Sequence, residues 1–304
     1  MTTDMTIVTP NYNRKSYLSL AIQTALSQTL NNLEIIVVDD CSTDGSQDLV
    51  ERIQKIDSRL RLLVHDHNRG PAAARNTGIK GASSRYITFL DSDDLLAPER
   101  CQILFARLEA EEDPCVVYTD WVSIDSTQVA FGSISSKASN RPEGMIFPHL
   151  VAGDFRFTGS CIAVSKVALQ QTGFYDERLR WAEDTDMALR LSLKFPFLFE
   201  RLATYGWRAH HGGSSEVLQR IQRMSYESRV LEKHIRNNLG SLDPSTKRMA
   251  FNRLIGCCVS GRQWQRLART SLIDAQAFLS LVTLPQRITR KKQNPPKASP
   301  STSG

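Results

Sequence analysis

Two aspartates that follow an apolar run have the spacing of a cation site. The segment Asp91-Ser92-Asp93-Asp94 comes directly after Arg85–Leu90, a run that predicts a buried strand. Oxygen ligands two residues apart suit a hard divalent cation such as Mg²⁺ or Mn²⁺, which keeps coordination positions open for phosphate oxygens. A cation held there would bridge a diphosphate and neutralise its charge as it leaves. The D-x-D pattern alone is common in acidic turns, and its place at a strand end is what favours a site.

Polar residues also follow the first two predicted strands. Pro10-Asn11-Tyr12-Asn13 follows the first strand and Asp39-Asp40 the second. In an open α/β sheet, ligands bind outside the carboxyl ends of the strands, so these residues would meet Asp91 and Asp93 at one edge. The alternative interpretation is that they cap helices or form solvated turns, which Asp and Ser favour anywhere.

The elements that must position these residues alternate along the first ninety residues. Strands are predicted at Met5–Thr9 (closed by Pro10), Leu33–Val38, Leu60–Val64 and Arg85–Leu90. Helices are predicted at Ser16–Leu30, from a cap at Ser42 or Thr43 to Gln54, and at Pro71–Lys80. Right-handed crossovers turn this βαβαβαβ order into a doubly wound, mostly parallel sheet flanked by helices.

The rest of the chain is less regular. Helices are predicted at Pro98–Glu112 and Asp184–Leu193, and extended segments at Cys115–Trp121, Ser160–Val164 and Phe197–Trp207. The polar, Gly/Ser-rich stretch Ser123–Arg156 predicts a loop-rich insertion or lid. Residues 216–284 are mainly helical in pattern, with a break near Gly240–Asp243, and residues 285–304 have the composition of a disordered basic tail.

Composition excludes several classes of protein. The chain has 304 residues, of which 41% are hydrophobic and 23% charged, as in an ordinary globular protein. No apolar run approaches the ~20 residues of a membrane span, and we expect no signal peptide and a cytoplasmic location. Part of the net charge of +6 lies in the tail. The sequence shows no face of aromatic and basic residues, which a nucleic-acid binder would be expected to have. The six cysteines show no CxxC and are expected to be reduced.

Two phosphate-binding patterns are missing. The sequence contains no G-x-x-x-x-G-K-[ST] and no G-x-G-x-x-G after the first strand. A P-loop or a dinucleotide site is therefore not supported. A metal-dependent nucleotidyltransferase would need a glycine-rich loop after the first strand, and Thr9–Arg14 is not one.

Three ordered motifs resemble glycosyltransferase family 2. They are Val37-Val38-Asp39-Asp40-Cys41-Ser42-Thr43-Asp44-Gly45-Ser46, Asn68-Arg69-Gly70-Pro71-Ala72-Ala73-Ala74-Arg75-Asn76-Thr77-Gly78, and Phe89-Leu90-Asp91-Ser92-Asp93-Asp94. The resemblance covers roughly residues 5–215 and implies the GT-A fold, with transfer of a sugar from a nucleotide sugar, usually with inversion. It divides the chain into a GT-A domain at 1–215, a helical region at 216–284 and the tail at 285–304.

On the donor side, the resemblance implies contacts with the nucleoside. Pro10 and Tyr12 would lie against the nucleoside, and Asp39 would hydrogen-bond the base, most often uracil. One departure is Cys41, where the family commonly has glycine. Because cysteine resists positive φ, we expect a slightly different turn there.

The resemblance also implies residues for the phosphates and the metal. Arg75 would approach the nucleotide or its phosphates, Asp91 the ribose and donor sugar, and Asp93 would ligate Mn²⁺ or Mg²⁺. In Trp207–Ser214, similar to the family's R-x-H segment, His210 would be a further metal or diphosphate ligand, and Arg208 would pair with phosphate oxygens. A surface position for His210 is the alternative.

On the acceptor side, the stretch Trp181-Ala182-Glu183-Asp184-Thr185-Asp186 resembles the family's E-D motif. Asp184 would be the general base that removes a proton from an acceptor hydroxyl, with Glu183 and Trp181 beside it. An inverting displacement needs a base opposite the leaving group. The alternative is a helix whose first turn is rich in acids because of the macrodipole.

The resemblance implies an inverting, metal-dependent glycosyltransferase of hexosyltransferase type. It would move a sugar, with UDP as the expected carrier, to a hydroxyl of a saccharide or lipid-linked acceptor, as in cell-surface polysaccharide synthesis. The basic tail would either contact anionic lipid at the inner face of the membrane or remain solvated. The alternative function is a non-catalytic nucleotide-sugar-binding or assembly module of the same fold.

Overall fold

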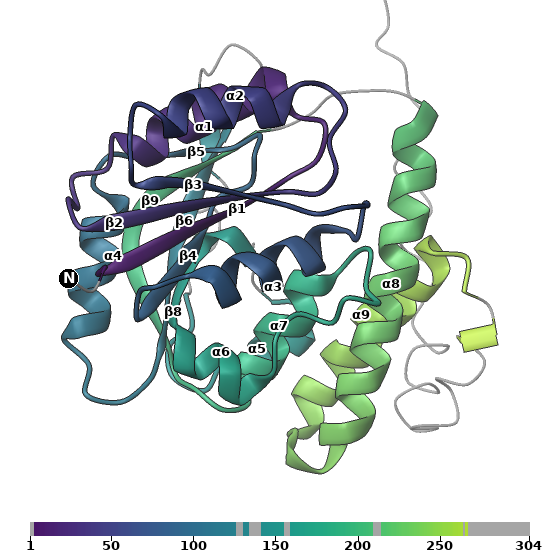
Figure 1. The fold of residues 1–304 in the computed structure, drawn as a ribbon. Helices are drawn as coiled ribbons and strands as arrows, with labels where there is room; N and C mark the ends of the chain where they lie inside the picture. Colours follow the sequence, from purple (N-terminus) through teal and green to yellow (C-terminus); the bar gives the residue numbers. More distant parts are fainter. Residues whose placement is uncertain are drawn as a thin grey trace, which may run out of the picture.

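The computed structural model describes residues 3–125, 130–133, 141–154, 159–208, 214–263 and 265–266. They form one sheet with helices against both faces (Figure 1). The strands are β1 Met5–Asn11, β2 Leu33–Asp39, β3 Leu60–Val64, β4 Tyr86–Phe89, β5 Leu95–Leu96, β6 Val116–Ile124, β7 Ala130–Ser133, β8 Ile162–Ser165 and β9 Phe197–Arg208. The helices are α1 Lys15–Leu26, α2 Ser46–Gln54, α3 Pro71–Gly81, α4 Arg100–Glu109, α5 Phe147–Ala152, α6 Lys166–Thr172, α7 Glu183–Ser192, α8 Ser214–Asn238 and α9 Pro244–Ser260.

The amino-terminal half of the sheet has the predicted α/β topology. Strands β3, β2, β1 and β4 lie in that order and are parallel, with Val8 opposite Ile36 on one side and Phe89 on the other. Every residue of β2 is buried, as expected for an apolar strand that has neighbours on both edges and helices on both faces.

Alternate residues of the parallel strands build two separate cores. Ile7 and Val37 pack against apolar residues of α1, α2 and α4 on one face. Val8 and Ile36 pack on the other face, in a core that includes residues of α3, α5, α7, α8 and α9. This division follows from the two-residue period of a strand, and Figure 1 shows α1 and α2 on the opposite side of the sheet from α3 and α7.

The carboxyl-terminal half makes the sheet mixed. Beyond β4 the order is β8, β6, β9 and β5, and the β4–β8, β6–β8 and β5–β9 pairs are antiparallel, whereas β6–β9 is parallel. Strand β7 pairs with β6 off this path. The sequence did not predict β5, β7, α5 or α6, which are short elements whose position is set by tertiary packing.

Pro10 does not close the first strand, as the sequence had suggested. It lies within β1 opposite Val38. The carbonyl of Val8 accepts from Leu90 N on the β4 side, so Pro10, two residues on, faces the same side. The β1–β4 ladder ends at Val8, so no residue of β4 pairs with Pro10. The N–H group that proline lacks is therefore not needed there for a ladder hydrogen bond.

The start of α2 also differs from its prediction. The helix begins at Ser46 after Gly45, whose φ is +81°, and Asp44 Oδ1 accepts from Ser46 N at 3.0 Å. Ser42 and Thr43 do not cap it. Instead, both bond to Asn13 in the loop after β1, through Ser42 Oγ and Thr43 N.

The helical pattern after residue 216 corresponds to α8 and α9, which are separated at residues 239–243. Parts of the predicted insertion at 123–156 and the whole tail at 285–304 lie outside the described residues. The proposed domain boundaries therefore stay predictions. In the portions of the chain that the structure describes, none of the helices combines the length and the apolar character needed to cross a bilayer.

Candidate active site

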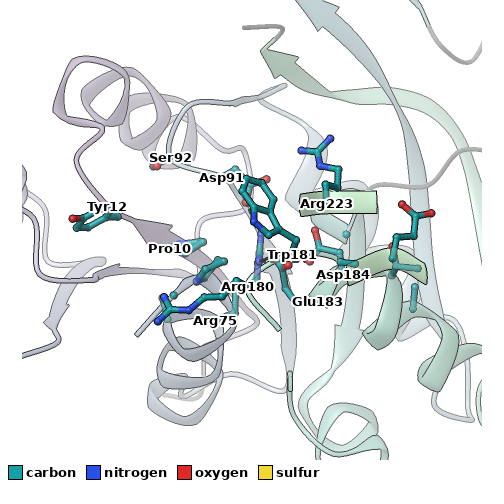
Figure 2. A pocket seen from close by; sticks show the side chains of 18 of the residues that line it. Pro10, Tyr12, Arg75, Asp91, Ser92, Arg180, Trp181, Glu183, Asp184 and Arg223 are labelled. Carbon is teal, nitrogen blue, oxygen red and sulfur yellow. Dashed lines mark hydrogen bonds and ion pairs between the residues drawn. The ribbon is translucent and has the colours of Figure 1, made fainter. Parts of the chain in front are cut away.

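A cavity of about 1050 Å³ opens at the carboxyl ends of β1 and β4 (Figure 2). Residues at the starts of α3 and α7 also line it, together with residues of α8 and α9. The cavity brings together most of the residues singled out in the sequence, namely Pro10, Tyr12, Arg75, Asp91, Asp93, Trp181, Glu183 and Asp184. The predicted convergence of acids from distant parts of the chain is therefore present for the D-x-D and E-D motifs.

Arg75 joins three parts of the chain inside this cavity. Its guanidinium donates to Asp91 Oδ1 at 2.9 Å and to Glu183 Oε1 at 2.8 Å, and lies 3.5 Å from Asp184 Oδ1. Burial opposes the charge of Arg75, but the carboxylates outweigh it and hold its pKa well above its usual range. A buried guanidinium with carboxylate partners fixes geometry, because each partner would be costly to leave unpaired.

The aspartates after β4 have different surroundings. Asp91 accepts from Arg75 with one oxygen and from Ser160 Oγ, at 2.9 Å, with the other. Asp93 keeps partial exposure and lies 3.6 Å from the Nε of Arg14. Both oxygens of Asp91 thus have side-chain donors, although its side chain keeps 30% exposure, against 21% for that of Asp93.

Asp94 holds the turn after β4 in place through hydrogen bonds to β9. It is buried and accepts from the hydroxyl of Tyr205 at 2.7 Å and from the backbone N of Arg208 at 2.7 Å. Burial, followed by the charges of Asp91 and Asp93, raises its pKa well above its usual range. Tyr205 was not identified from the sequence. The only signal there was its position two residues before Trp207.

Arg208 contributes to the same turn and does not line the cavity. Its Nε donates to the carbonyl of Asp93 at 2.7 Å, and its NH1 donates to the carbonyl of Asp125 at 2.9 Å. The side chain is buried and its cation lies over the ring of Tyr17. The structure thus places Arg208 behind the D-x-D turn. His210, the second predicted metal ligand, lies outside the described residues.

Asp184 lies in the first turn of α7, facing the cavity. Burial, with the charges of Glu183 and Asp91, raises its pKa to about 7, although Arg75 acts in the opposite direction. Its Oδ1 accepts no hydrogen bond from any residue within the described ranges. Oδ1 itself is buried, but the side chain as a whole keeps 30% exposure. A partly exposed carboxylate with a pKa near neutrality can take a proton from an alcohol.

Backbone conformation brings Asp184 to this position. Ala182, the residue before α7, has φ +63°, a left-handed conformation that alanine adopts only at a cost of about 1 kcal/mol. Gly159 leaves the space that Asp184 fills, since a Cβ there would collide with the carboxylate carbon of Asp184.

The two aspartates after β2 take different places. Asp39 is buried and does not line the cavity; it accepts from Asn11 Nδ2, Ser42 N and Gln47 Nε2, each at 2.8 Å. Asp40 does line the cavity. It accepts from His65 Nδ1 and from two backbone amides, including Gly70 N at 2.7 Å, and so fixes the loop before α3.

Cys41 adopts the conformation that glycine would favour. Its φ is +66°, so the turn after β2 is left-handed despite the side chain. Whether this turn differs from that of relatives with glycine stays a prediction.

Several lining residues were not found from the sequence. Arg180 precedes the E-D motif, and α8 and α9 contribute Arg223, Glu227 and Arg253. The only sequence signal for Arg180 was its position next to Trp181. Periodicity predicted a helix around Arg223 but could not indicate which face the cavity would contact.

The described side chains supply few ligands for a divalent cation. The described residues contain no cluster of three or more His, Cys, Asp or Glu side chains arranged to hold a metal ion. Asp93, a partly exposed carboxylate that lines the cavity, is suited to bind a cation together with oxygens from a diphosphate.

A family model described as "Glycosyl transferase family 2" matches residues 6–173. The succinoglycan biosynthesis protein ExoO of Rhizobium meliloti is 31% identical over 282 residues, which are 92% of this chain and 76% of that protein. The putative teichuronic acid biosynthesis glycosyltransferase TuaG of Bacillus subtilis is 41% identical over 90 residues, 30% of this chain and 36% of that protein.

Two solved structures share the fold. The mannosyltransferase PcManGT of Pyrobaculum calidifontis, solved in complex with GDP-Man and Mn²⁺, has a TM-score of 0.62 at 18% identity, covering 92% of this chain and 79% of that one. S. aureus TarS 1-349, in complex with UDP-GlcNAc, has a TM-score of 0.59 at 16% identity, covering 90% and 89%.

Proposed function

This chain belongs to glycosyltransferase family 2, and from that premise we propose that it is an inverting transferase in which Asp184 is the general base. The donor is a nucleotide sugar and the acceptor group is a hydroxyl of a saccharide or a lipid-linked saccharide. One observation carries the proposal: Asp184, a partly exposed carboxylate with a raised pKa, shares a cavity with Asp91 and Asp93.

The proposed step is a single displacement. The acceptor hydroxyl gives its proton to the carboxylate of Asp184 while its oxygen forms a bond to the anomeric carbon of the donor sugar. The bond between that carbon and the diphosphate oxygen breaks, and its electron pair leaves with the nucleoside diphosphate. Because attack and departure occur on opposite faces of the sugar, the configuration inverts.

Arg75 orients the groups on both sides of this step. Its bonds to Asp91 and Glu183 tie the strand end, where the diphosphate would lie, to the start of α7. Asp93 would hold a divalent cation, Mn²⁺ or Mg²⁺, against the diphosphate. When bound, such a cation would neutralise the charge on the leaving group. Pro10 and Tyr12 would lie against the nucleoside on the far side of the cavity.

The names of relatives suggest the biological context. ExoO and TuaG are named for the biosynthesis of succinoglycan and teichuronic acid, so we propose a role in cell-surface polysaccharide synthesis. UDP is the expected carrier, and GDP is the alternative, because the similar structures contain UDP-GlcNAc and GDP-Man. A cytoplasmic location and contact of the tail with the membrane stay predictions.

Nucleotide-sugar hydrolysis without acceptor and transfer to saccharides test the proposal. We expect the wild-type protein to bind and slowly hydrolyse one of UDP-glucose, UDP-GlcNAc or GDP-mannose, more slowly after EDTA treatment and normally again with Mn²⁺. Asp184→Asn should lower transfer by about 10²- to 10⁴-fold, the usual share of a general base, and leave nucleotide binding unchanged. Asp113→Asn, an exposed control, should behave like the wild type.

The pH dependence gives a second readout of the base. Transfer requires ionised Asp184, so kcat/KM should rise with pH up to about 7 and then level off, following its raised pKa. Full transfer by Asp184→Asn would disprove the assignment. Binding of a nucleotide sugar with neither hydrolysis nor transfer would favour the alternative of a non-catalytic binding module.

A further inference from the structure

The arginines that line the cavity differ in their partners. Three of them pair with carboxylates: Arg14 with Asp93, Arg75 with Asp91, and Arg253 with Glu227. For Arg180 and Arg223, by contrast, the described part of the chain provides no ion pair. Neither cation is thus paired within 4 Å of a described carboxylate, although Arg223 is near enough to Asp184 to oppose the rise of its pKa.

Arg180 is held on the wall formed by the loop before α3. Its NH1 donates to Asn68 Oδ1 at 3.2 Å. Gly70 makes this approach possible, since a Cβ there would come within 3.1 Å of the same nitrogen. The guanidinium is thus placed by neutral groups only, and its charge is available to a ligand.

Arg223 reaches the cavity from α8, beside the proposed base. Its guanidinium lies over the indole of Trp181, 5.6 Å from the ring centre. Figure 2 shows Arg223 and Asp184 on the same side of Trp181. Trp181 lies between the two arginines, next to Arg180 in sequence and against Arg223 in space. An aromatic face flanked by guanidinium groups suits an acidic sugar, because the ring packs and the anion pairs.

We infer that Arg180 and Arg223 form a subsite for an acceptor saccharide that bears an anionic group, a carboxylate or a phosphate. The inference rests on the proposed function, in which Asp184 marks the acceptor side. Arg180 and Arg223 lie after residue 173, outside the stretch that the family model matches. The donor diphosphate belongs at the other side, near Asp91 and Asp93.

Matched sugars that differ in charge test the subsite. The probes are methyl β-D-glucoside, methyl β-D-glucuronide and glucose 1-phosphate, titrated by NMR into protein saturated with nucleoside diphosphate. We expect the wild-type protein to bind at least one charged probe about tenfold more tightly than the neutral one, as for one charge-assisted hydrogen bond. Which charged probe binds more tightly distinguishes a uronic acid from a sugar phosphate.

Variants assign the preference to particular side chains. Arg180→Gln and Arg223→Gln should each remove most of the preference and leave binding of the neutral probe and of the nucleotide unchanged. Arg229→Gln is the control: Arg229 is also on α8 and also lies over an aromatic ring, that of Tyr226 at 5.2 Å, but does not line the cavity. It should keep the full preference.

Two results would overturn the inference, and a separate readout tests its premise. Equal binding of all three probes to the wild type would show that no anion subsite exists. Weaker nucleotide binding in Arg180→Gln or Arg223→Gln, with the charge preference intact, would assign these arginines to the donor. Hydrolysis of the nucleotide sugar without a probe tests the proposed function alone. If the protein hydrolyses the nucleotide sugar but shows no charge preference, only the subsite inference is wrong. If it neither hydrolyses nor binds the nucleotide sugar, the proposed function and the subsite inference are both wrong.

Discussion

The position of Asp184 depends on contacts with its neighbours more than on hydrogen bonds to its side chain. Arg75 Nη1 is 3.5 Å from its Oδ1, a distance at which the charges attract without a hydrogen bond. On the opposite side the absence of a side chain at Gly159 makes room for the carboxylate. Oδ1 is buried beside these neighbours, so a substrate would meet the carboxylate through the part of the side chain that stays exposed, 30% of it.

Gly159→Ala should therefore impair catalysis without affecting donor binding. The added methyl group would collide with the carboxylate carbon of Asp184, whose short side chain has little room to move. A shift of about 1 Å in a catalytic group can cost about 100-fold in rate, so we expect transfer to fall between about 10- and 100-fold. Steady-state transfer and calorimetric titration of the nucleotide measure the two effects.

Gly240→Ala is the matched control for this substitution. A Cβ at Gly240 meets nothing within 4 Å, so transfer should be unchanged. Wild-type transfer rates in Gly159→Ala would mean that the carboxylate of Asp184 tolerates displacement, which contradicts a role as the base.

At the scale of elements, α7 is held by a charged network on the side opposite the cavity. Asp186 is fully buried, and its carboxylate bonds to Arg190 Nε at 2.7 Å and to Lys233 Nζ and His234 Nε2, each at 3.0 Å. Lys233 and His234 lie on α8, so the network fastens α8 to the helix that carries Asp184. Burial opposes ionisation of Asp186, but these partners outweigh it and lower its pKa far below its usual range.

Asp186→Asn should destabilise the protein at neutral pH but much less in acid. At pH 7 we expect the free energy of unfolding to fall by about 2 kcal/mol, the typical contribution of hydrogen bonds to a charged group. Because the native pKa is lowered, this stability is present above the unfolded pKa of about 4 and is lost as pH falls towards the native pKa. The difference between variant and wild type should therefore shrink below pH 4.

Urea denaturation at pH 7, 5 and 3.5 measures this difference. Asp113→Asn, in an exposed loop, provides the control and should match the wild type at each pH. A difference for Asp186→Asn that is constant from pH 7 to 3.5 would show that the charge of Asp186 contributes nothing.

At the scale of the whole molecule, the elements that were predicted correctly are those that local sequence patterns determine. The apolar strands β2 and β3 and the helix α3, with Pro71 at its start, match their predicted ranges within about one residue. Asp91 and Asp93 meet the end of β1 as expected, because the direction of a parallel strand fixes which edge its end occupies. Asp184 joins them from the start of α7, a place that strand direction does not determine. The roles of individual site residues stay predictions that the experiments above test.

Other features depend on tertiary contacts that no local pattern encodes. β5 has only two residues and exists because β9 pairs with it. Asp39 and Asp40 are adjacent, and only the loops around them decide that Asp40 faces the cavity while Asp39 bonds three neighbours. Likewise, Arg223 reaches the cavity because α8 packs against α7, about 40 residues earlier in the chain.

The helices α8 and α9 share one core with the sheet, so the described part of the chain should unfold as a unit. Leu231 and Phe251 belong to the same buried cluster as Val8, Ile36 and Leu189. Tryptophan fluorescence and far-UV circular dichroism should therefore give coincident urea transitions.

Leu231→Ala should lower the stability reported by both probes by about 2–5 kcal/mol, the usual cost of truncating a buried leucine. Met249→Ala, at a side chain 41% exposed on α9, should change it by less than about 0.5 kcal/mol. If helicity were lost in Leu231→Ala before fluorescence changed, α8 and α9 would fold separately from the domain that holds the cavity, and Arg223 could not be a fixed part of its wall.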